Sequence, residues 1–527
     1  MMDGSFPSAA TPALAPAQAQ EGTLSSTTLL CATAAVAIAL HLPGMSRYGF
    51  FRDELYYIAC SEHLAWGYVD QPPLIALIAW ISRHVLGNSL VAFRVLPILA
   101  GAVSVYLTGW LARELGGSRL AQCTSALAIL FAPLYLAFDS ILTMNAFEPV
   151  FWLACAAIAA RIANGGSPKL WLLFGLISGV GLENKHTMAV FGFGLVVGFL
   201  LSGDLRPFRS RWIWVGGLIA LAIAAPNLVW EARHGWPQIT VVRNAQLLKN
   251  EPVGPLRFLG EQVLFYSPIA LPLWLGGLAW LLAARDGKRF RFLGCAYLVV
   301  MAIFMVADGK TYYPMAAYPM LMAAGGVAFE KISTSQGWKP VRIAYPALIA
   351  LAGLLTLPFG VPVLPANTFL KYADAFPYAH EVKTERDSTA RLPQNYADML
   401  GWDTLARTVA SVYYALPEAE RSSCAILAGN YGEAGAIDYY GPALGLPKTI
   451  GGHNSYFNWG PRQYSGECVI LFGENSEEHK NYFSDVQQAA TVSTPLAMPS
   501  EQNLPIYVCR KPKEPLAELW PFFKFII

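Results

Sequence analysis

The sequence has few charged residues and no strong excess of either sign. Only 14% of its 527 residues are Asp, Glu, Lys or Arg, the net charge is +2, and 55% are hydrophobic. So few charges on so apolar a chain exclude an ordinary water-soluble protein. The balance of charge also excludes the dense basic surface that nucleic-acid binding requires. We therefore expect the lipid bilayer to be the main solvent and no nucleic acid to be a partner.

The eight cysteines form no CxxC pair and no Cys/His cluster with the spacing of a zinc site. Five lie in or near apolar segments, where cysteine usually acts as a small hydrophobic side chain. Cys424, Cys468 and Cys509 lie in a polar C-terminal region. One disulfide could form there if that region is extracytoplasmic, which would leave an odd thiol.

The N-terminal residues also lack Lys and Arg, and they are rich in Ala, Pro, Ser and Gln. A cleaved signal peptide begins with a positively charged region. The composition therefore predicts a disordered leader over residues 1–26 and a first apolar segment that is retained.

Apolar runs long enough to cross a bilayer recur through the first two thirds of the chain. The eleven runs lie at roughly 27–43, 91–112, 119–137, 146–163, 169–182, 186–202, 212–230, 263–284, 291–307, 312–329 and 342–364. Segment 72–87 is shorter and carries Arg83 and His84, so we expect a partly embedded or interfacial helix there. The inverted internal repeat expected of many secondary transporters is not visible.

Basic residues mark alternate connections between these runs. With a cytoplasmic N-terminus, the inner connections carry Arg113 and Arg119, Arg161 and Lys169, Arg206, Arg209 and Arg211, Arg285, Lys288, Arg289 and Arg291, and Lys331, Lys339 and Arg342. This is the positive-inside pattern. An odd number of spans then places everything after about residue 365 outside the membrane.

The composition changes after residue 365, where spans stop and short β-like runs such as 468–472 and 506–509 appear. The predicted fold is an all-α polytopic membrane domain over residues 27–364 with an extracytoplasmic soluble α/β domain over residues 365–527. Multiple passes and this topology predict an integral membrane protein whose outer loops share one face with the C-terminal domain.

Unusual polar residues gather in the outer connections. They are Asp53 and Glu54, Asp70 and Gln71, Asn145 and Glu148 with Asp139 in reserve, Lys185 and His186, Arg233, and Lys310 with Tyr312 and Tyr313. Ionisable groups at a membrane boundary are costly unless they pair, are hydrated or serve a site. Several from different turns favour a shared cavity, although a cap or a snorkelling side chain explains each one alone equally well.

Asp53 and Glu54 begin an apparent amphipathic helix just outside the first span. Acidic residues there are good helix caps. A carboxylate beside a dry surface is also suited to general-base catalysis, because partial desolvation raises its basicity. Asp70 precedes the rigid Pro72-Pro73 pair on the same loop, where a cap or turn is the simpler role.

Cationic side chains in the other outer connections are suited to a phosphate or diphosphate at the lipid surface. Lys310 is the preferred candidate because it stands alone directly before an apolar span. Lys185, His186 and Arg233 are further candidates, and Tyr312-Tyr313 fits either a binding role or an aromatic belt.

Two motifs occur in the C-terminal region. Gly429-Asn430-Tyr431-Gly432-Glu433-Ala434-Gly435 lies between a strand-like and a helix-like run, where tight-turn geometry is favoured over anion binding because the spacing is not GxGxxG. Gly451-Gly452-His453-Asn454 precedes an aromatic run at 456–459 that could stack on a sugar ring or simply pack in a core.

The order of three motifs resembles a known family. An Asp-Glu-x-x-Tyr loop after the first span, an acidic-x-Pro-Pro segment and a late Lys-x-Tyr-Tyr segment are similar to those of the GT-C membrane glycosyltransferases. The similar members are the protein O-mannosyltransferases, aminoarabinose transferases and lipopolysaccharide galacturonosyltransferases. The resemblance covers roughly residues 45–330, and the order of these short motifs carries most of its weight.

The resemblance implies a polyprenyl-phosphate sugar donor and makes Asp53 the catalytic acidic residue of the first outer loop. It also implies a bacterial inner membrane protein whose active site faces the periplasm. Gln71 departs from the Lys that the lipid A branch has before the two prolines. Handling of the donor phosphate or of a metal is therefore expected to differ. No metal is required by the residues, although Asp53 and Asp70 could hold a divalent cation.

These features predict an inverting membrane glycosyltransferase. Asp53, assisted by Glu54, would deprotonate an acceptor on an envelope lipid, glycan or protein, and the other outer residues would bind the substrates. One alternative is a transporter or flippase of a lipid-linked or anionic substrate, which would place its charges near the midplane. Another is a non-catalytic assembly protein that binds envelope glycans through its C-terminal region.

Overall fold

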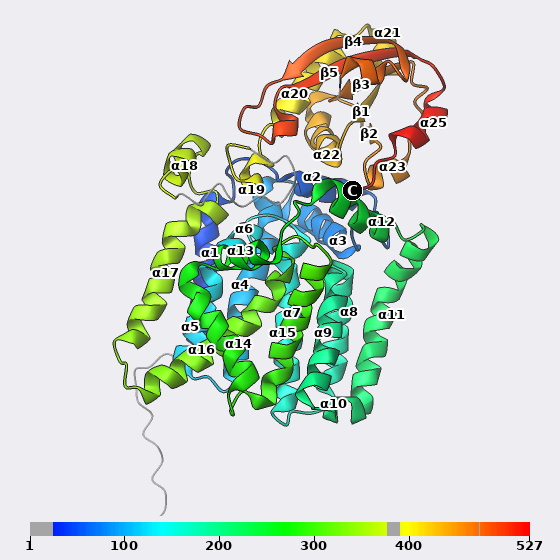
Figure 1. The fold of residues 1–527 in the computed structure, drawn as a ribbon. Coiled ribbons are helices and arrows are strands. Elements are labelled where there is room, and N and C mark those ends of the chain that lie inside the picture. Colours follow the sequence, from blue (N-terminus) through cyan, green and yellow to red (C-terminus); the bar gives the residue numbers. More distant parts are fainter. Residues whose placement is uncertain (1–24, 377–389, 474) are drawn as a thin grey trace, which may run out of the picture.

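The computed structural model describes residues 25–376, 390–473 and 475–527, so the predicted leader lies almost wholly outside the described residues. Long helices stand side by side in a bundle, a layer of short helices covers one end of the bundle, and an α/β domain lies on that layer (Figure 1). The protein is therefore mostly helical, with a small sheet near its C-terminus.

The bundle helices coincide with the predicted apolar runs. They are α1 (Ser26–His41), α4 (Leu90–Glu114), α5 (Arg119–Leu130), α7 (Met144–Ala163), α8 (Leu170–Asn184), α9 (Thr187–Ser202), α11 (Arg211–Arg233), α14 (Leu271–Ala283), α15 (Arg291–Val306), α16 (Tyr318–Ser335) and α17 (Val341–Gly360). Six helices of the described chain are long and apolar enough to cross a membrane, or seven if a pair bent by 97° counts as one span. The predicted number of eleven is not confirmed, because helices such as α5 and α8 are short.

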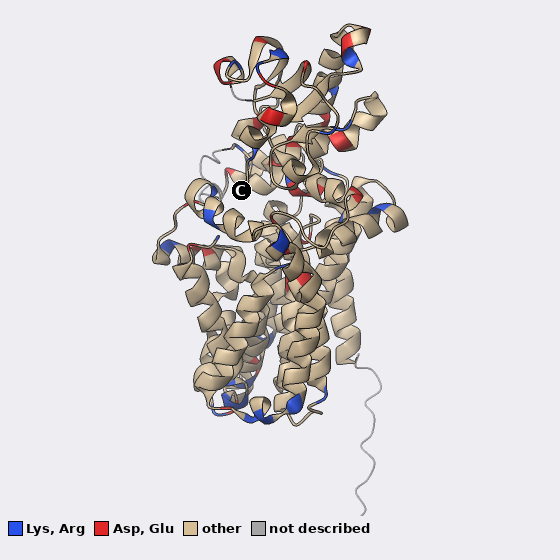
Figure 2. Ribbon diagram, turned by 90° about the vertical axis from the view of Figure 1, so that its right-hand side faces the viewer, with Lys and Arg blue, Asp and Glu red and all other residues tan. Residues whose placement is uncertain are grey.

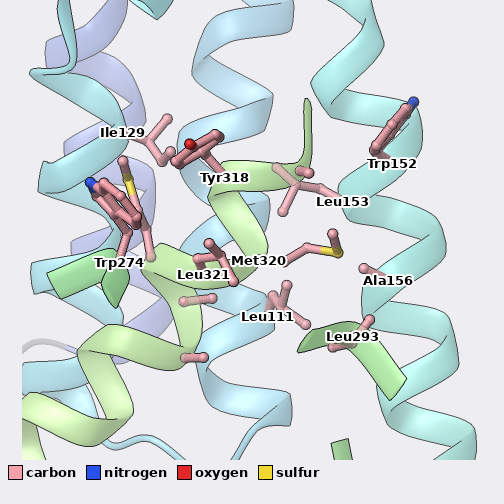
Figure 3. Close-up of a cluster of buried hydrophobic side chains, with 14 of the residues drawn as sticks. Leu111, Ile129, Trp152, Leu153, Ala156, Trp274, Leu293, Tyr318, Met320 and Leu321 are labelled. Carbon is pink, nitrogen blue, oxygen red and sulfur yellow. The ribbon is translucent and has the colours of Figure 1, made fainter. Parts of the chain in front are cut away.

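Apolar side chains and close backbone contacts hold the bundle together. Figure 3 shows part of its core, where Leu111, Trp152 and Leu321 are fully buried. Helices α8 and α11 touch at Gly175, where a Cβ would lie 2.1 Å from the carbonyl oxygen of Gly216. Such small residues let membrane helices approach closely, so these two helices need glycine at their crossing.

A band of basic residues lies at the end of the bundle that faces away from the α/β domain, and other basic residues lie in the covering layer and in that domain, as Figure 2 shows in blue. This end includes the short helix α10 (Arg206–Arg209) and the connection before α15. The alternation of basic and non-basic loops in the sequence therefore corresponds to two physically opposite ends, as expected of a multi-pass membrane protein.

The covering layer consists of α2 (Arg52–Glu62), α3 (Leu74–Ile81), α6 (Pro133–Phe138), α12 (Pro237–Asn244), α13 (Pro255–Phe265), α18 (Ala366–Ala373) and α19 (Gln394–Ala397). The segment predicted to be an interfacial helix corresponds to α3 and the π-helical turn Ser82–Leu86 that follows it. This layer contains the first outer loop and therefore positions Asp53 and Asp70.

The C-terminal domain is built on a five-stranded sheet with strand order β2-β1-β3-β5-β4. Its elements are α20 (Trp402–Ala415), α21 (Glu418–Arg421), β1 (Ala425–Ala428), α22 (Tyr431–Tyr440), β2 (Ile450–Gly451), α23 (Ser455–Trp459), β3 (Cys468–Phe472), α24 (Ser476–His479), β4 (Phe483–Val492), β5 (Leu504–Pro512) and α25 (Leu516–Leu519). Strands β1, β2 and β3 are parallel, whereas β4 and β5 pair antiparallel. Cys424 and Cys468 form a disulfide and Cys509 is a free thiol.

A buried ion pair organises the start of the covering layer. The guanidinium of Arg94 on α4 lies 3.8 Å from the carboxylate of Glu54 on α2. Arg94 also donates hydrogen bonds to backbone carbonyls in the preceding loop, at residues 44, 45, 47 and 49. Glu54 accepts from the backbone N–H groups of Phe51 and Leu142, each at 2.8 Å. These contacts set where α2 begins, and hence where the neighbouring Asp53 lies.

We expect Glu54→Gln to lower the free energy of unfolding by about 3–5 kcal/mol, because it leaves Arg94 charged, buried and without its counter-ion. Thermal unfolding of the purified protein in detergent measures this loss. Glu62→Gln is the matched control, since Glu62 pairs with Arg83 and Lys448 where water screens the charges, and it should cost less than about 1 kcal/mol. Equal losses in the two variants would contradict the role given to the buried pair.

Candidate active site

Asp53 lies in the first turn of α2, at the junction of the bundle and the C-terminal domain. Its side chain is 29% exposed, and Arg52 lies 3.9 Å from its Oδ1. The phenol of Tyr431, from the C-terminal domain, donates a 2.8 Å hydrogen bond to the same Oδ1. Asp53 is thus oriented by neighbours on both sides while part of it stays accessible.

Asp70 lies close to Asp53, on the loop between α2 and α3. Its Oδ1 accepts from the Tyr56 hydroxyl at 2.8 Å and its Oδ2 from the Asn454 amide at 3.1 Å. Burial raises the pKa of Asp70 to about 6; the hydrogen bond from Tyr56 opposes this shift and the charge of Asp53 adds to it. The fold therefore brings the two predicted carboxylates together, and the pKa of one of them, Asp70, is raised to about 6.

A second cluster joins predicted residues from three segments. Lys185, directly after α8, lies 3.0 Å from the Glu148 carboxylate and donates to the Asn145 amide oxygen at 2.7 Å. Its ammonium also lies 4.9 Å from the ring centre of Tyr313. Thr187 donates a further hydrogen bond to Glu148. The sequence separates these residues widely, but the outer end of the bundle collects them around one buried ion pair.

The other predicted residues take varied positions. His186 is hydrogen-bonded to the Asn227 amide oxygen at 2.9 Å, and Lys310 lies 6.0 Å from the ring centre of Tyr312. Arg233 is exposed at the end of α11, whereas Gln71 is fully buried and donates to the Cys60 sulfur at 3.6 Å. Gln71 is therefore an uncharged side chain packed in the protein core.

Glu54, like Gln71, is a fully buried member of the predicted set. Its side chain is 0% exposed, and burial raises its pKa, opposed by Arg94. Its two oxygens accept hydrogen bonds from the backbone N–H groups of Phe51 and Leu142 and thereby hold the loop in place.

Sequence reasoning missed three residues that contact the two aspartates: Tyr56, Tyr431 and Asn454. Tyr56 falls on a variable position of the Asp-Glu-x-x-Tyr motif, whose tyrosine is Tyr57, so only its place beside the motif was a signal. Tyr431 and Asn454 lie inside the two glycine-containing motifs of the C-terminal region, to which no contact with the membrane part was assigned.

The site around Asp53 and Asp70 offers few protein ligands for a divalent cation. The described residues include no group of three or more His, Cys, Asp or Glu side chains placed to hold a metal. Asp53 and Asp70 alone supply fewer oxygens than the six or more that Mg²⁺ and Ca²⁺ take, so water and substrate oxygens would have to complete the coordination.

Comparisons with known proteins agree with this architecture. Residues 70–230 match the model of the family described as dolichyl-phosphate-mannose-protein mannosyltransferase. A lipid A galacturonosyltransferase, RgtD, of Rhizobium johnstonii is 23% identical over 418 residues, which are 76% of this chain and 84% of the relative. An undecaprenyl phosphate-alpha-4-amino-4-deoxy-L-arabinose arabinosyl transferase of Pseudomonas aeruginosa is 26% identical, over 59% of this chain and 60% of its own length.

Among solved structures, ArnT from Cupriavidus metallidurans bound to undecaprenyl phosphate superimposes with a TM-score of 0.61 at 13% identity. The superposition covers 92% of this chain and 98% of ArnT, so the two proteins share a fold over both the bundle and the C-terminal domain. The resemblance to the GT-C membrane glycosyltransferases is confirmed.

We expect the Lys185 and Glu148 side chains to be energetically coupled. Lys185→Met alone should lower the free energy of unfolding by about 3–5 kcal/mol, because Glu148 is then left charged and buried without its partner. Adding Glu148→Gln should recover part of the loss, which a double-mutant cycle of unfolding free energies measures. Additive losses would show that the two residues do not interact in this way.

Proposed function

We propose that this chain, a membrane glycosyltransferase of the GT-C type, moves a sugar from a polyprenyl-phosphate donor to an acceptor of the cell envelope. The observation that carries the proposal is Asp53, a partly exposed carboxylate at the outer end of an apolar bundle, held beside a second carboxylate. The named relatives, which act on lipid A or use an undecaprenyl-phosphate-linked sugar, support an envelope lipid as the acceptor.

The reaction is an inverting transfer in which the Asp53 carboxylate takes the proton of the acceptor hydroxyl or amine as it attacks the anomeric carbon. The bond from that carbon to the phosphate oxygen breaks, and polyprenyl phosphate leaves. Lys310 supplies positive charge on the same face, where the developing phosphate charge needs it, and Lys185, paired with Glu148, adds a hydrogen-bond donor there. Asp70 and Asn145 would orient the substrates.

A transporter fits the structure less well. The ionisable residues of the proposed site lie at helix ends in and beneath the covering layer, whereas transporters usually place them near the midplane on broken helices. The exposed carboxylate beside the C-terminal domain favours chemistry at one face over passage between two faces.

The proposal includes a topology. We infer eleven crossings, since the short helices stand within the same bundle as the long ones, with the basic end in the cytoplasm. Residues 27–364 would form the membrane domain and 365–527 the extracytoplasmic domain. This arrangement places Asp53 on the periplasmic side of a bacterial inner membrane.

Asp53→Asn should abolish transfer while leaving expression and thermal stability close to those of the wild type, because the amide keeps the shape but cannot accept a proton. Transfer is measured in membranes supplied with a lipid-linked sugar. Asp403→Asn, on the exposed surface of α20, is the control and should retain full activity. Near-normal turnover of the Asp53 variant would reject its assignment as the base.

Transfer should also fall as the pH is lowered through about 6. The pKa of Asp70 is raised to about 6, so its carboxylate is ionised above that pH and protonated below it. If the ionised form orients substrate, activity requires the higher pH range. Asp70→Asn should be less active and should lack this step in its pH profile. An unchanged step in the variant would assign the titration to another group.

A further inference from the structure

The C-terminal domain reaches both carboxylates of the proposed site. Tyr431 donates to Asp53 at 2.8 Å and Asn454 donates to Asp70 at 3.1 Å. These pairs are separated by 378 and 384 positions in the sequence, so folding of the two parts against each other creates both bonds.

Tyr431 is held in place from several directions. It is the first residue of α22, which Asn430 caps by accepting from the N–H groups of Gly432 and Glu433. Its own N–H donates to Nδ1 of His453 at 3.3 Å. Its ring centre lies 4.8 Å from that of Tyr56 and 4.7 Å from that of His453. These contacts restrain the Tyr431 side chain so that its hydroxyl faces Asp53.

Glycines allow α22 to lie directly on the helix that carries Asp53. A Cβ at Gly435 would be 2.8 Å from the backbone of Leu55 on α2, and one at Gly432 would be 2.5 Å from the Cγ of Arg52. The first contact is with backbone and cannot move aside. The motif at 429–435 thus serves as a docking surface for α2, which explains Gly432 and Gly435 without a nucleotide.

Asn454 is built into the same junction. It is fully buried, has a positive φ of 50° that side-chain-bearing residues rarely adopt, and exchanges two hydrogen bonds with the backbone of Ile527. The next residue, Ser455, accepts from the Val69 N–H and donates its own N–H to the Tyr56 hydroxyl, each at 3.2 Å. This loop therefore holds both the chain before Asp70 and the tyrosine bonded to it.

We propose that the C-terminal domain completes the active site, with Tyr431 and Asn454 as positioning residues for Asp53 and Asp70. The inference rests on the proposed function for the role of Asp53. A phenol bonded to Oδ1 restricts rotation of the carboxylate and directs its remaining acceptor capacity toward a substrate. The base is then preorganised, which matters because small displacements of a catalytic group cost large factors in rate.

The test compares two Tyr→Phe variants that each remove one hydroxyl from the junction. Tyr431→Phe should lower kcat about tenfold to a hundredfold with the donor KM unchanged, since a hydrogen bond to a charged group is lost. Tyr439→Phe removes a 2.9 Å bond from the same helix to the backbone oxygen of Asn88, away from the carboxylates, and should stay within about twofold of the wild type. If the kcat of Tyr431→Phe equals or exceeds that of the wild type, the proposal is overturned. A higher kcat would indicate that the C-terminal domain obstructs the site.

A second measurement does not need turnover. Modification of Asp53 by a water-soluble carbodiimide, followed by mass spectrometry, should increase several-fold in Tyr431→Phe and stay unchanged in Tyr439→Phe. If the wild type transfers no sugar, the proposed function is rejected but the positioning role of Tyr431 is not. Unchanged labelling of Asp53 in Tyr431→Phe would reject the positioning role of Tyr431, whatever reaction the protein catalyses. As a control, equal protease resistance of the wild type and both variants would show that the C-terminal domain remains docked.

Discussion

The buried ion pair of Glu54 and Arg94 is the interaction on which the outer face depends. It brings the start of α2 onto the top of α4, and Arg94 simultaneously gathers the carbonyls of the loop that follows the first bundle helix. Two charges can be buried together only when further hydrogen bonds satisfy them, and backbone groups at residues 51 and 142 do this for Glu54. Asp53 is adjacent in the chain, so its position follows from this pair.

Two adjacent acidic residues therefore have different surroundings and different uses. Glu54 points into the protein and is fully buried, whereas Asp53 points toward the C-terminal domain and stays partly exposed. On a helix, neighbouring residues project about 100° apart, so one of them can face the bundle while the other faces the junction. The accessible carboxylate is the one suited to contact a substrate.

The outer face contains two ionic centres with different electrostatics. Around Asp53 and Asp70, carboxylates are held mainly by neutral donors, namely Tyr431, Tyr56 and Asn454. Around Glu148 the carboxylate is neutralised by Lys185. A centre rich in negative charge suits proton removal, whereas an ion pair with no net charge does not by itself attract an anion.

The sequence by itself determined the apolar runs, the basic end, the change of composition near residue 365 and Asp53 as the leading candidate. Each of these is a local property, because a span is recognised by the hydrophobicity of its own residues and a loop by its own charges. The sequence did not determine how many runs are full-length spans, since breaks shorten several helices, as in the pair α13 and α14, which is bent by 97° just before Pro268.

Only the tertiary structure decided which residues meet. Asp53 and Glu54 are adjacent acidic residues, and nothing local shows that Arg94 buries Glu54 and not Asp53. The pairing of Lys185 with Glu148, and of Tyr431 with Asp53, joins residues 37 and 378 positions apart. Such contacts arise from packing of whole helices and domains, in which glycines such as Gly435 permit the approach. These long-range contacts cannot be recognised from the periodicity or composition of a single segment.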